Sequence, residues 1–347
     1  MSAAPQDLRV GFVGLGNMGA PMVRNLAQAG FALTLLDLDE ALQAELVGEL
    51  GAKGATTSAD FARCDVVVTM LPDDRAVRTV MLDWEGGIAN ALRSGAVLVD
   101  MSSSNPAGTI KLGDALEDNG IGFVDAPVSG GIARAVTGTL ALMAGTNDGE
   151  YLERVTPVLL ALGAQIFPTG PLGSGHAMKA LNNFVGATTY VITAEALAIG
   201  QHYGLTPATM VGVFNASTAR SFNSEVVFKE HVVSGRYATA FALGLITKDV
   251  GIAAGLAEES GVDAPFTRLS RARWNGAVSQ LGHGADHSEA HKSWWGADFV
   301  DVAPEVSAAP AASEAPAVAE APADSGEDVA EPSDEVAEVS EEAPAAG

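Results

Sequence analysis

Six short apolar runs in the first half of the chain constrain its fold more than any other feature. The runs are Val10–Val13, Leu33–Leu36, Val66–Met70, Val97–Val99, Phe123–Val124 and Leu140–Met143. They are continuous rather than alternating, which is typical of strands buried on both faces. Helical stretches separate them, and strands that alternate with helices form a parallel sheet with right-handed crossovers. The sequence therefore predicts an α/β domain with a doubly wound parallel sheet.

A second region begins after the Pro/Gly-rich segment 168–175, PTGPLGSG, beyond which strand signals vanish. Ser174 is placed to cap a long helix that runs to about Tyr203, before Gly204 and Pro207. Further helices are predicted over 207–215, 218–234, 241–260 and 265–281. We therefore expect an all-α domain to follow the sheet.

The last part of the chain differs in composition from both regions. The chain has 347 residues and a formal net charge of −24. From residue 297 onward it has 14 Asp or Glu and no Lys or Arg, in a pattern rich in Ala, Pro and Glu. Such a segment buries no core, so we expect a disordered acidic tail. The predicted parts are the α/β domain 1–168, the all-α domain 169–296 and the tail 297–347.

Composition argues against several classes of protein. The remaining 29 acidic and 19 basic residues leave 1–296 acidic too, without a basic patch for nucleic acid. The nearest approach to a membrane helix, 185–200, is interrupted by threonines and Glu195. The single cysteine, Cys64, forms no intramolecular disulfide and suits a reducing compartment. With no targeting segment evident, we expect a cytoplasmic protein that binds no nucleic acid, membrane or metal.

A glycine motif follows the first apolar run directly. Gly14, Gly16 and Gly19 form G-x-G-x-x-G at the start of a predicted helix, with Leu15, Asn17 and Met18 between them. The first glycine allows a tight turn, the second lets a pyrophosphate approach the backbone, and the third lets the helix pack closely on the strand. The helix N-terminus then offers free N–H groups to the phosphates. This pattern predicts a Rossmann domain that binds a dinucleotide.

An acidic residue at the end of the second strand indicates which dinucleotide binds. Asp37 ends the run Leu33–Leu36 and lies 18 residues after Gly19, where a carboxylate accepts hydrogen bonds from the adenosine ribose. It would repel a 2′-phosphate, and no Arg follows within a few residues, so NAD is favoured over NADP. Asp39, two residues on, is the alternative for this contact.

Seven blocks in order along residues 8 to about 295 resemble the β-hydroxyacid dehydrogenase family, which includes 3-hydroxyisobutyrate dehydrogenase and tartronate semialdehyde reductase. The blocks are GFVGLGNMGAPM (11–22), MLPDD (70–74), VDMSSSNP (99–106), DAPVSGG (125–131), GTL (138–140), GSGHAMKALNN (173–183) and ITKDVGIA (246–253). The resemblance implies an NAD-dependent enzyme whose domain 1–168 binds the cofactor, whereas 169–296 serves the substrate and dimerisation.

The resemblance also implies residue roles. The family's catalytic position falls on Lys179. Its substrate-binding positions fall on Ser129, Gly130, Gly131 and Asn183. Its cofactor-binding positions in these blocks fall on Leu71, Pro72, Ser103 and Lys248. Ser103 stands where the family usually has Thr, and it retains the hydroxyl.

The residues themselves agree with these roles. Lys179 and Asn183 are four apart on one predicted helix and share a face. Gly130 and Gly131 leave backbone N–H groups open to an anion, to which Ser129 adds a hydroxyl. A lysine has an ordinary pKa of about 10.4. Desolvation and a positive nicotinamide ring would lower it toward that of a useful base. His176, three residues before Lys179, is expected in a supporting or surface position.

Alternatives remain for the substrate. The leading hypothesis is a 3-hydroxyisobutyrate-type dehydrogenase with Lys179 as general acid/base. A reductase of tartronate semialdehyde or a related semialdehyde, a threonate-type dehydrogenase, and a catalytically silent dinucleotide-binding interaction module are the others. Arg134, Arg220 and Phe222 are weaker substrate-contact candidates, and Lys248–Asp249 alone would be a surface charge pair. The long apolar helix 175–203 favours pairing with another subunit, and the resemblance implies a homodimer or homotetramer.

Overall fold

The computed structural model describes residues 8–295, and within them a nine-stranded sheet forms the first half. The strands are β1 (Arg9–Val13), β2 (Ala32–Leu36), β3 (Lys53–Gly54), β4 (Val66–Thr69), β5 (Val97–Asp100), β6 (Gly122–Asp125), β7 (Val128–Ser129), β8 (Leu140–Gly145) and β9 (Gly163–Gly170). Their order is β3-β2-β1-β4-β5-β6-β8-β7, and β9 pairs with β8. All six predicted runs are strands, which confirms the α/β prediction.

The sheet is mainly parallel, as predicted, and is antiparallel at one end. The strands from β3 to β6 are parallel, but β8 runs antiparallel to β6 and β7. A short reversal through β7 and α6 (Gly131–Thr137), rather than a full crossover, connects β6 to β8. Strand β9 was missed because it is largely exposed and contains Pro168, which marks an edge rather than an apolar run.

Helices cover both faces of the parallel part of the sheet. Val66 and Val68 pack with Met22 of α1 (Gly19–Gln28) and Leu159 of α7 (Gly149–Leu162). The other face, from Val67 and Leu98, packs against α4 (Ile88–Ala91) and α5 (Pro106–Glu117). Successive residues of one strand therefore enter opposite cores, which is why the runs are continuous.

The second half is helical, as predicted. The remaining helices are α2 (Glu40–Leu50), α3 (Asp74–Arg78), α8 (Ser174–His202), α9 (Pro207–Asn215), α10 (Leu243–Ser260), α11 (Pro265–Leu281) and α12 (Lys292–Trp295). Those predicted over 207–215 and 265–281 have the predicted bounds, whereas 218–234 holds a shorter π-helical segment, Asn223–Val232. Tyr190 stacks on Phe228 beside Trp274 in the core of this half.

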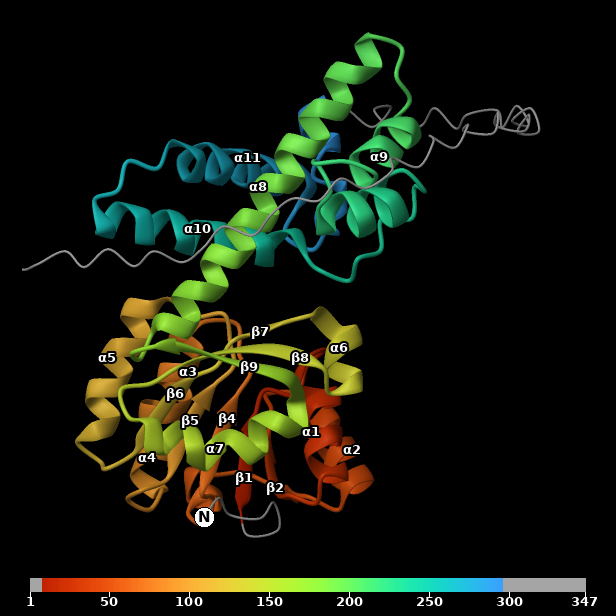
Figure 1. Cartoon of the computed structure of the whole chain (residues 1–347). Coiled ribbons are helices and arrows are strands. Elements are labelled where there is room, and N and C mark those ends of the chain that lie inside the picture. Colours follow the sequence, from red (N-terminus) through yellow and green to blue (C-terminus); the bar gives the residue numbers. More distant parts are fainter. Residues whose placement is uncertain (1–7, 296–347) are drawn as a thin grey trace, which may run out of the picture. The chain divides into compact units, whose positions relative to one another are not determined.

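Helix α8 links the two halves (Figure 1). Its start packs on β8 and β9, and its later turns pack on α9, α10 and α11. The prediction that Ser174 caps this helix was wrong, because Ser174 is its first helical residue. The N-cap residue is Gly173, which has left-handed backbone angles and no side chain to accept a capping hydrogen bond. The free N–H groups in the first turn of α8 therefore need hydrogen-bond acceptors from another part of the chain.

Two predictions concern the acidic tail and the domain boundaries. The acidic tail 297–347 lies outside the described residues, and the division of the chain at 168 and 296 stays a prediction. No helix within 8–295 is long and apolar enough to cross a membrane.

Candidate active site

The glycine loop lies at the carboxyl end of β1, and its glycines differ in surroundings. Gly14 has φ +95°, and a Cβ there would overlap the Met70 carbonyl oxygen. A Cβ on Gly19 would overlap the carbonyl of Gly14, so α1 lies tightly on the turn. At exposed Gly16, by contrast, a Cβ would meet nothing within 4 Å. Two glycines are thus required by the fold, and the middle one borders open space.

The start of α1 also suits a phosphate. Its cap residue, Met18, makes no side-chain cap bond, and no acidic residue lies in the first turn. Asn17 is exposed beside Gly16, whereas Leu15 is buried and contributes to the core. An uncapped helix N-terminus beside a glycine without close neighbours fits the pyrophosphate of a dinucleotide.

Asp37 is tied to this loop. Its Oδ2 accepts a hydrogen bond from the Leu15 N–H at 2.5 Å, and its Oδ1 accepts one from the Asp39 N–H at 2.8 Å. Asp39 instead caps α2 by accepting from the N–H groups of Ala41 and Leu42. The Asp39 carboxylate therefore has a structural task, which leaves Asp37 as the acidic group beside the glycine loop.

Lys248 of α10 meets two loops of the sheet half. Its Nζ donates to the carbonyl oxygens of Pro72 and Ser103, both at 2.6 Å. Pro72 follows Leu71 after β4, and Ser103 follows β5. Three of the positions implied for cofactor binding are thus joined by direct contacts, although they lie far apart in sequence.

Lys179 and Asn183 lie on the sheet-proximal part of α8. Lys179 is partly buried and donates no hydrogen bond to another described residue. Burial lowers its pKa, the charge of Asp249 raises it, and that of Lys248 lowers it further. The net effect is an amine that loses its proton more readily than an ordinary lysine does.

Asp249 is a site residue that the sequence analysis missed. It is 3% exposed and accepts a 2.6 Å hydrogen bond from Asn183 Nδ2, and its Oδ1 has no hydrogen-bond partner among the described residues. Burial raises its pKa, against the charges of Lys179 and Lys248. Lys248–Asp249 is therefore not a surface charge pair. The only available signal was its place in ITKDVGIA, because neighbours on one helix do not reveal which of them is buried.

The loop Ser129–Gly131 links β7 to α6. Gly130 has φ +131°, and a Cβ there would lie 2.5 Å from Cδ of Arg134, so the stem of that exposed arginine packs against the loop. None of the three loop residues makes a hydrogen bond to Lys179 or Asn183. Arg220 forms an ion pair with Glu225 at 2.6 Å, and Phe222 is 71% exposed.

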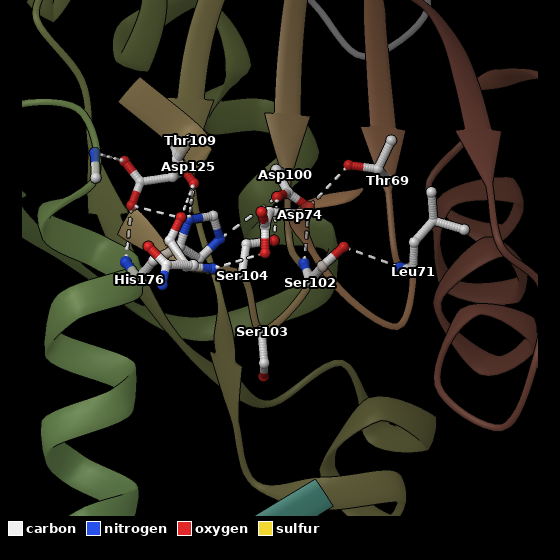
Figure 2. A network of polar contacts seen from close by, with 12 residues as sticks. Thr69, Leu71, Asp74, Asp100, Ser102, Ser103, Ser104, Thr109, Asp125 and His176 are labelled. Carbon is white, nitrogen blue, oxygen red and sulfur yellow. Dashed lines mark hydrogen bonds and ion pairs between the residues drawn. The ribbon is translucent and has the colours of Figure 1, made fainter. Parts of the chain in front are cut away.

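A buried polar network lies behind these loops (Figure 2). Asp100 accepts hydrogen bonds from Thr69 Oγ1, the Ser102 N–H and Ser104 Oγ, at 2.9, 3.0 and 2.8 Å. The Ser103 side chain points away from this network. His176 also belongs to it and is 1% exposed, so it occupies no surface position. Sequence reasoning did not connect these residues because they come from three segments that lie far apart in the sequence.

Comparison with known proteins agrees with this geometry. Residues 9–170 match the NAD binding domain of 6-phosphogluconate dehydrogenase, and 173–294 match the NAD-binding domain of NADP-dependent 3-hydroxyisobutyrate dehydrogenase. A 2-(hydroxymethyl)glutarate dehydrogenase of Eubacterium barkeri is 36% identical over 290 residues, which are 83% of this chain and 95% of that protein. The chain belongs to the β-hydroxyacid dehydrogenase family.

Other relatives show how the family varies. An NAD-dependent L-serine dehydrogenase of Pseudomonas aeruginosa is 35% identical over 269 residues, 76% of this chain and 89% of that one. A structure of 3-hydroxyisobutyrate dehydrogenase from Mycobacterium tuberculosis with L-serine superposes with a TM-score of 0.75 at 27% identity, covering 83% and 99% of the two chains. This chain is accordingly a dehydrogenase that acts on CH–OH groups with NAD(P), which confirms the predicted enzyme class.

Proposed function

We propose that this enzyme uses NAD to oxidise a small β-hydroxy acid resembling 3-hydroxyisobutyrate, with Lys179 as the general acid/base. The observation that carries the proposal is the environment of Lys179. Its amine is partly buried, has a lowered pKa, and is free of hydrogen bonds to other described residues on the helix face that it shares with Asn183. A base for an alcohol proton needs such a pKa and an unoccupied lone pair.

The roles of the protein groups follow from their positions. A bound nicotinamide cofactor would supply the hydride acceptor for oxidation of the alcohol carbon. Neutral Lys179 accepts the hydroxyl proton at Nζ as the carbonyl forms, and it returns that proton in the reverse direction. Asn183, held by Asp249, has its carboxamide oriented toward the substrate. The N–H groups of Gly130 and Gly131, with the Ser129 hydroxyl, bind the substrate carboxylate.

The substrate class is supported by what the relatives share. 2-(Hydroxymethyl)glutarate, L-serine and 3-hydroxyisobutyrate each carry a primary alcohol on the carbon β to a carboxylate, and all three appear in the relatives' names. One site for the carboxylate and one base for the alcohol satisfy that shared pattern. The three compounds differ in the other groups on the carbon between the alcohol and the carboxylate. Exposed Arg134 is the charged side chain nearest to the Gly130 turn, where we place the carboxylate.

The decisive assay follows NADH absorbance with 3-hydroxyisobutyrate, L-serine, 2-(hydroxymethyl)glutarate, threonate and glycerate, and in reverse with tartronate semialdehyde. We expect turnover of at least one β-hydroxy acid, and loss of that turnover in Lys179→Ala with NAD binding retained. Lys111→Ala, at an exposed lysine of α5, is the matched control and should behave as wild type. NAD binding without turnover of any compound would indicate the silent binding module instead.

The preference for NAD rests on Asp37. A carboxylate fixed beside the glycine loop accepts bonds from ribose hydroxyls and repels a 2′-phosphate. Asp37→Asn removes the charge and keeps an oxygen that can accept from the Leu15 N–H. We expect the ratio of kcat/KM for NAD to that for NADP to fall at least about tenfold, or about 1.4 kcal/mol. An unchanged ratio would contradict the assignment.

A homodimer or homotetramer is supported by a stripe along α8. Met178, Val185, Ile192 and Ile199 recur every seventh residue, and they are 43, 62, 57 and 56% exposed. A seven-residue period places them along one face, which a second copy of the chain would cover. Val185→Glu with Ile192→Glu should reduce the mass measured by light scattering after size exclusion, whereas His202→Glu should not. A wild-type monomer would refute self-association.

A further inference from the structure

Two buried carboxylates lie side by side at the carboxyl ends of neighbouring strands. Asp100 ends β5 and Asp125 ends β6, and they are register partners in the parallel ladder. They are 1% and 0% exposed, respectively. Two like charges on neighbouring strands in a buried site are costly unless other groups compensate them.

The compensating group is the side chain of His176. Its Nε2 lies 3.5 Å from Asp100 Oδ2, and its Nδ1 lies 3.6 Å from Asp125 Oδ2. The ring is also within hydrogen-bond distance of Thr109, with 2.8 Å between Nδ1 and Oγ1. Figure 2 shows the ring between the two aspartates. It is the one basic side chain, among residues 8–295, within ion-pair distance of either carboxylate.

Asp125 also supplies the cap that α8 lacks. Its Oδ1 accepts from the Gly173 N–H and its Oδ2 from the His176 N–H, both at 2.7 Å. A carboxylate at a helix N-terminus satisfies free N–H groups and interacts favourably with the helix dipole. The approach is close, because a Cβ on Gly175 would overlap the Met143 carbonyl oxygen and lie 2.7 Å from Asp125 Oδ2. The first turn of α8 is thus pressed onto the strand ends.

The other end of the network reaches the loop after β4. Asp100 Oδ1 accepts from the Ser102 N–H, and Ser102 Oγ accepts from the Leu71 N–H at 2.9 Å. Leu71 adjoins Pro72, and Ser102 adjoins Ser103, whose carbonyl oxygens both bind Lys248. A continuous chain of polar contacts therefore joins these two loops, through Asp100 and His176, to the first turn of α8.

We propose that His176 and Asp125 are positioning residues for catalysis: with Asp100 they fix the first turn of α8 against the loops at Leu71 and Ser102, and so set where Lys179 stands relative to the cofactor. The proposal rests on the proposed role of Lys179. Lys179 lies three residues after His176, on the same side of the helix. A rotation of that turn would therefore move the amine directly.

The chemistry of the network favours positioning over a second reactive site. No three His, Cys, Asp or Glu side chains within 8–295 are grouped to hold a metal ion. Both aspartates and the histidine are fully enclosed, so a substrate does not reach them. Burial raises the pKa of Asp125 to about 6, while His176 and the two N–H donors oppose that rise. The donors that hold α8 therefore also help to keep this carboxylate ionised near neutral pH.

The test compares His176→Leu, His176→Gln, Asp125→Ala and Asp125→Asn in the full chain. Gln and Asn retain polar groups, so these variants should recover part of what Leu and Ala lose. We expect kcat for the best β-hydroxy acid to fall about 10²-fold in His176→Leu, because small misplacements of a catalytic group cost about that much. NAD affinity should change little, whereas the unfolding midpoint should fall, because the two buried carboxylates lose their compensating partner. Exposed His202→Gln, on the far end of α8, and Asp148→Asn, at the cap of α7, are the controls.

Amide hydrogen exchange gives a readout that does not depend on activity. Residues 174–180 should exchange faster in His176→Leu and Asp125→Ala than in the controls, while 195–202 of the same helix should not. Wild-type kcat in His176→Leu would overturn the proposal, as would a fall in NAD affinity as large as the fall in kcat. If wild-type enzyme oxidises no compound tested, the proposed function fails; unchanged exchange in 174–180 would then separately refute the positioning role.

Discussion

Gly16→Ala separates the fold from cofactor binding more cleanly than any other single substitution in the glycine loop. Gly16 does not have a positive φ, and a Cβ there meets no atom within 4 Å. Alanine therefore fits the folded chain without strain. The methyl group would nevertheless occupy the open space beside the N-terminus of α1, where we expect the pyrophosphate to lie.

The expected changes in the free energy of unfolding differ between Gly14→Ala and Gly16→Ala. At a compatible position, Gly→Ala stabilises a protein by about 0.4–1 kcal/mol, because the unfolded chain loses freedom. Gly14→Ala should instead destabilise by more than about 2 kcal/mol, because φ is +95° and the new methyl overlaps the Met70 carbonyl. For NAD, Gly16→Ala should weaken binding at least about tenfold, which is about 1.4 kcal/mol.

Two measurements on each variant decide the matter. Urea unfolding monitored by circular dichroism gives the free energy of unfolding, and titration calorimetry gives the Kd for NAD. We expect Gly16→Ala to keep or gain stability and to lose NAD affinity, and Gly14→Ala to lose both. A Gly16→Ala protein that binds NAD as tightly as wild type would refute the placement of the pyrophosphate at this loop.

Two further predictions concern pH. Because the pKa of Lys179 is lowered, its neutral form is present at lower pH than for an ordinary lysine; kcat for alcohol oxidation should therefore rise with pH through an inflection below 10.5, and aldehyde reduction should fall through the same inflection. A kcat profile with its inflection at or above 10.5 would contradict Lys179 as the base. Burial raises the pKa of Asp125 from 3.8 to about 6, although the nearby His176 opposes the rise. The protonated form is therefore favoured on folding. Its contribution to stability is present at low pH and is lost as pH rises from about 4 to 6. The corresponding free energy is about 3 kcal/mol, so the unfolding free energy of wild type relative to Asp125→Asn should fall by about that amount over this range in urea titrations at fixed pH; a constant difference would show that Asp125 titrates normally.

Much of the fold could be predicted from the sequence, because its determinants are local. A strand buried on both faces needs a continuous apolar run, and all six runs are strands of the sheet. The bounds of α9 and α11 follow from their prolines and apolar spacing. The glycine loop could be predicted equally well, since the positive φ of Gly14 and the contact of Gly19 with the Gly14 carbonyl both belong to the turn itself.

Only part of the candidate site could be predicted from local sequence patterns. Lys179 and Asn183 share a helix face, which a four-residue spacing reveals. Asp249, however, is buried against Asn183 from another helix, and its neighbour Lys248 reaches two loops more than 140 positions away. No local pattern distinguishes such a pair from an ordinary surface pair, because burial depends on which elements pack against the helix.

The sequence by itself determined where strands and helices form, and where a dinucleotide fits, because these depend on side-chain periodicity and on the backbone freedom of single glycines. The tertiary structure alone decided how the sheet closes through antiparallel β8, and which strand end caps α8. Asp125 and His176 acquire their partners only when β5, β6, α5 and α8 converge. Hydrogen bonds and charges act over a few ångströms in space, whatever the distance along the chain, so their consequences appear only in the folded protein.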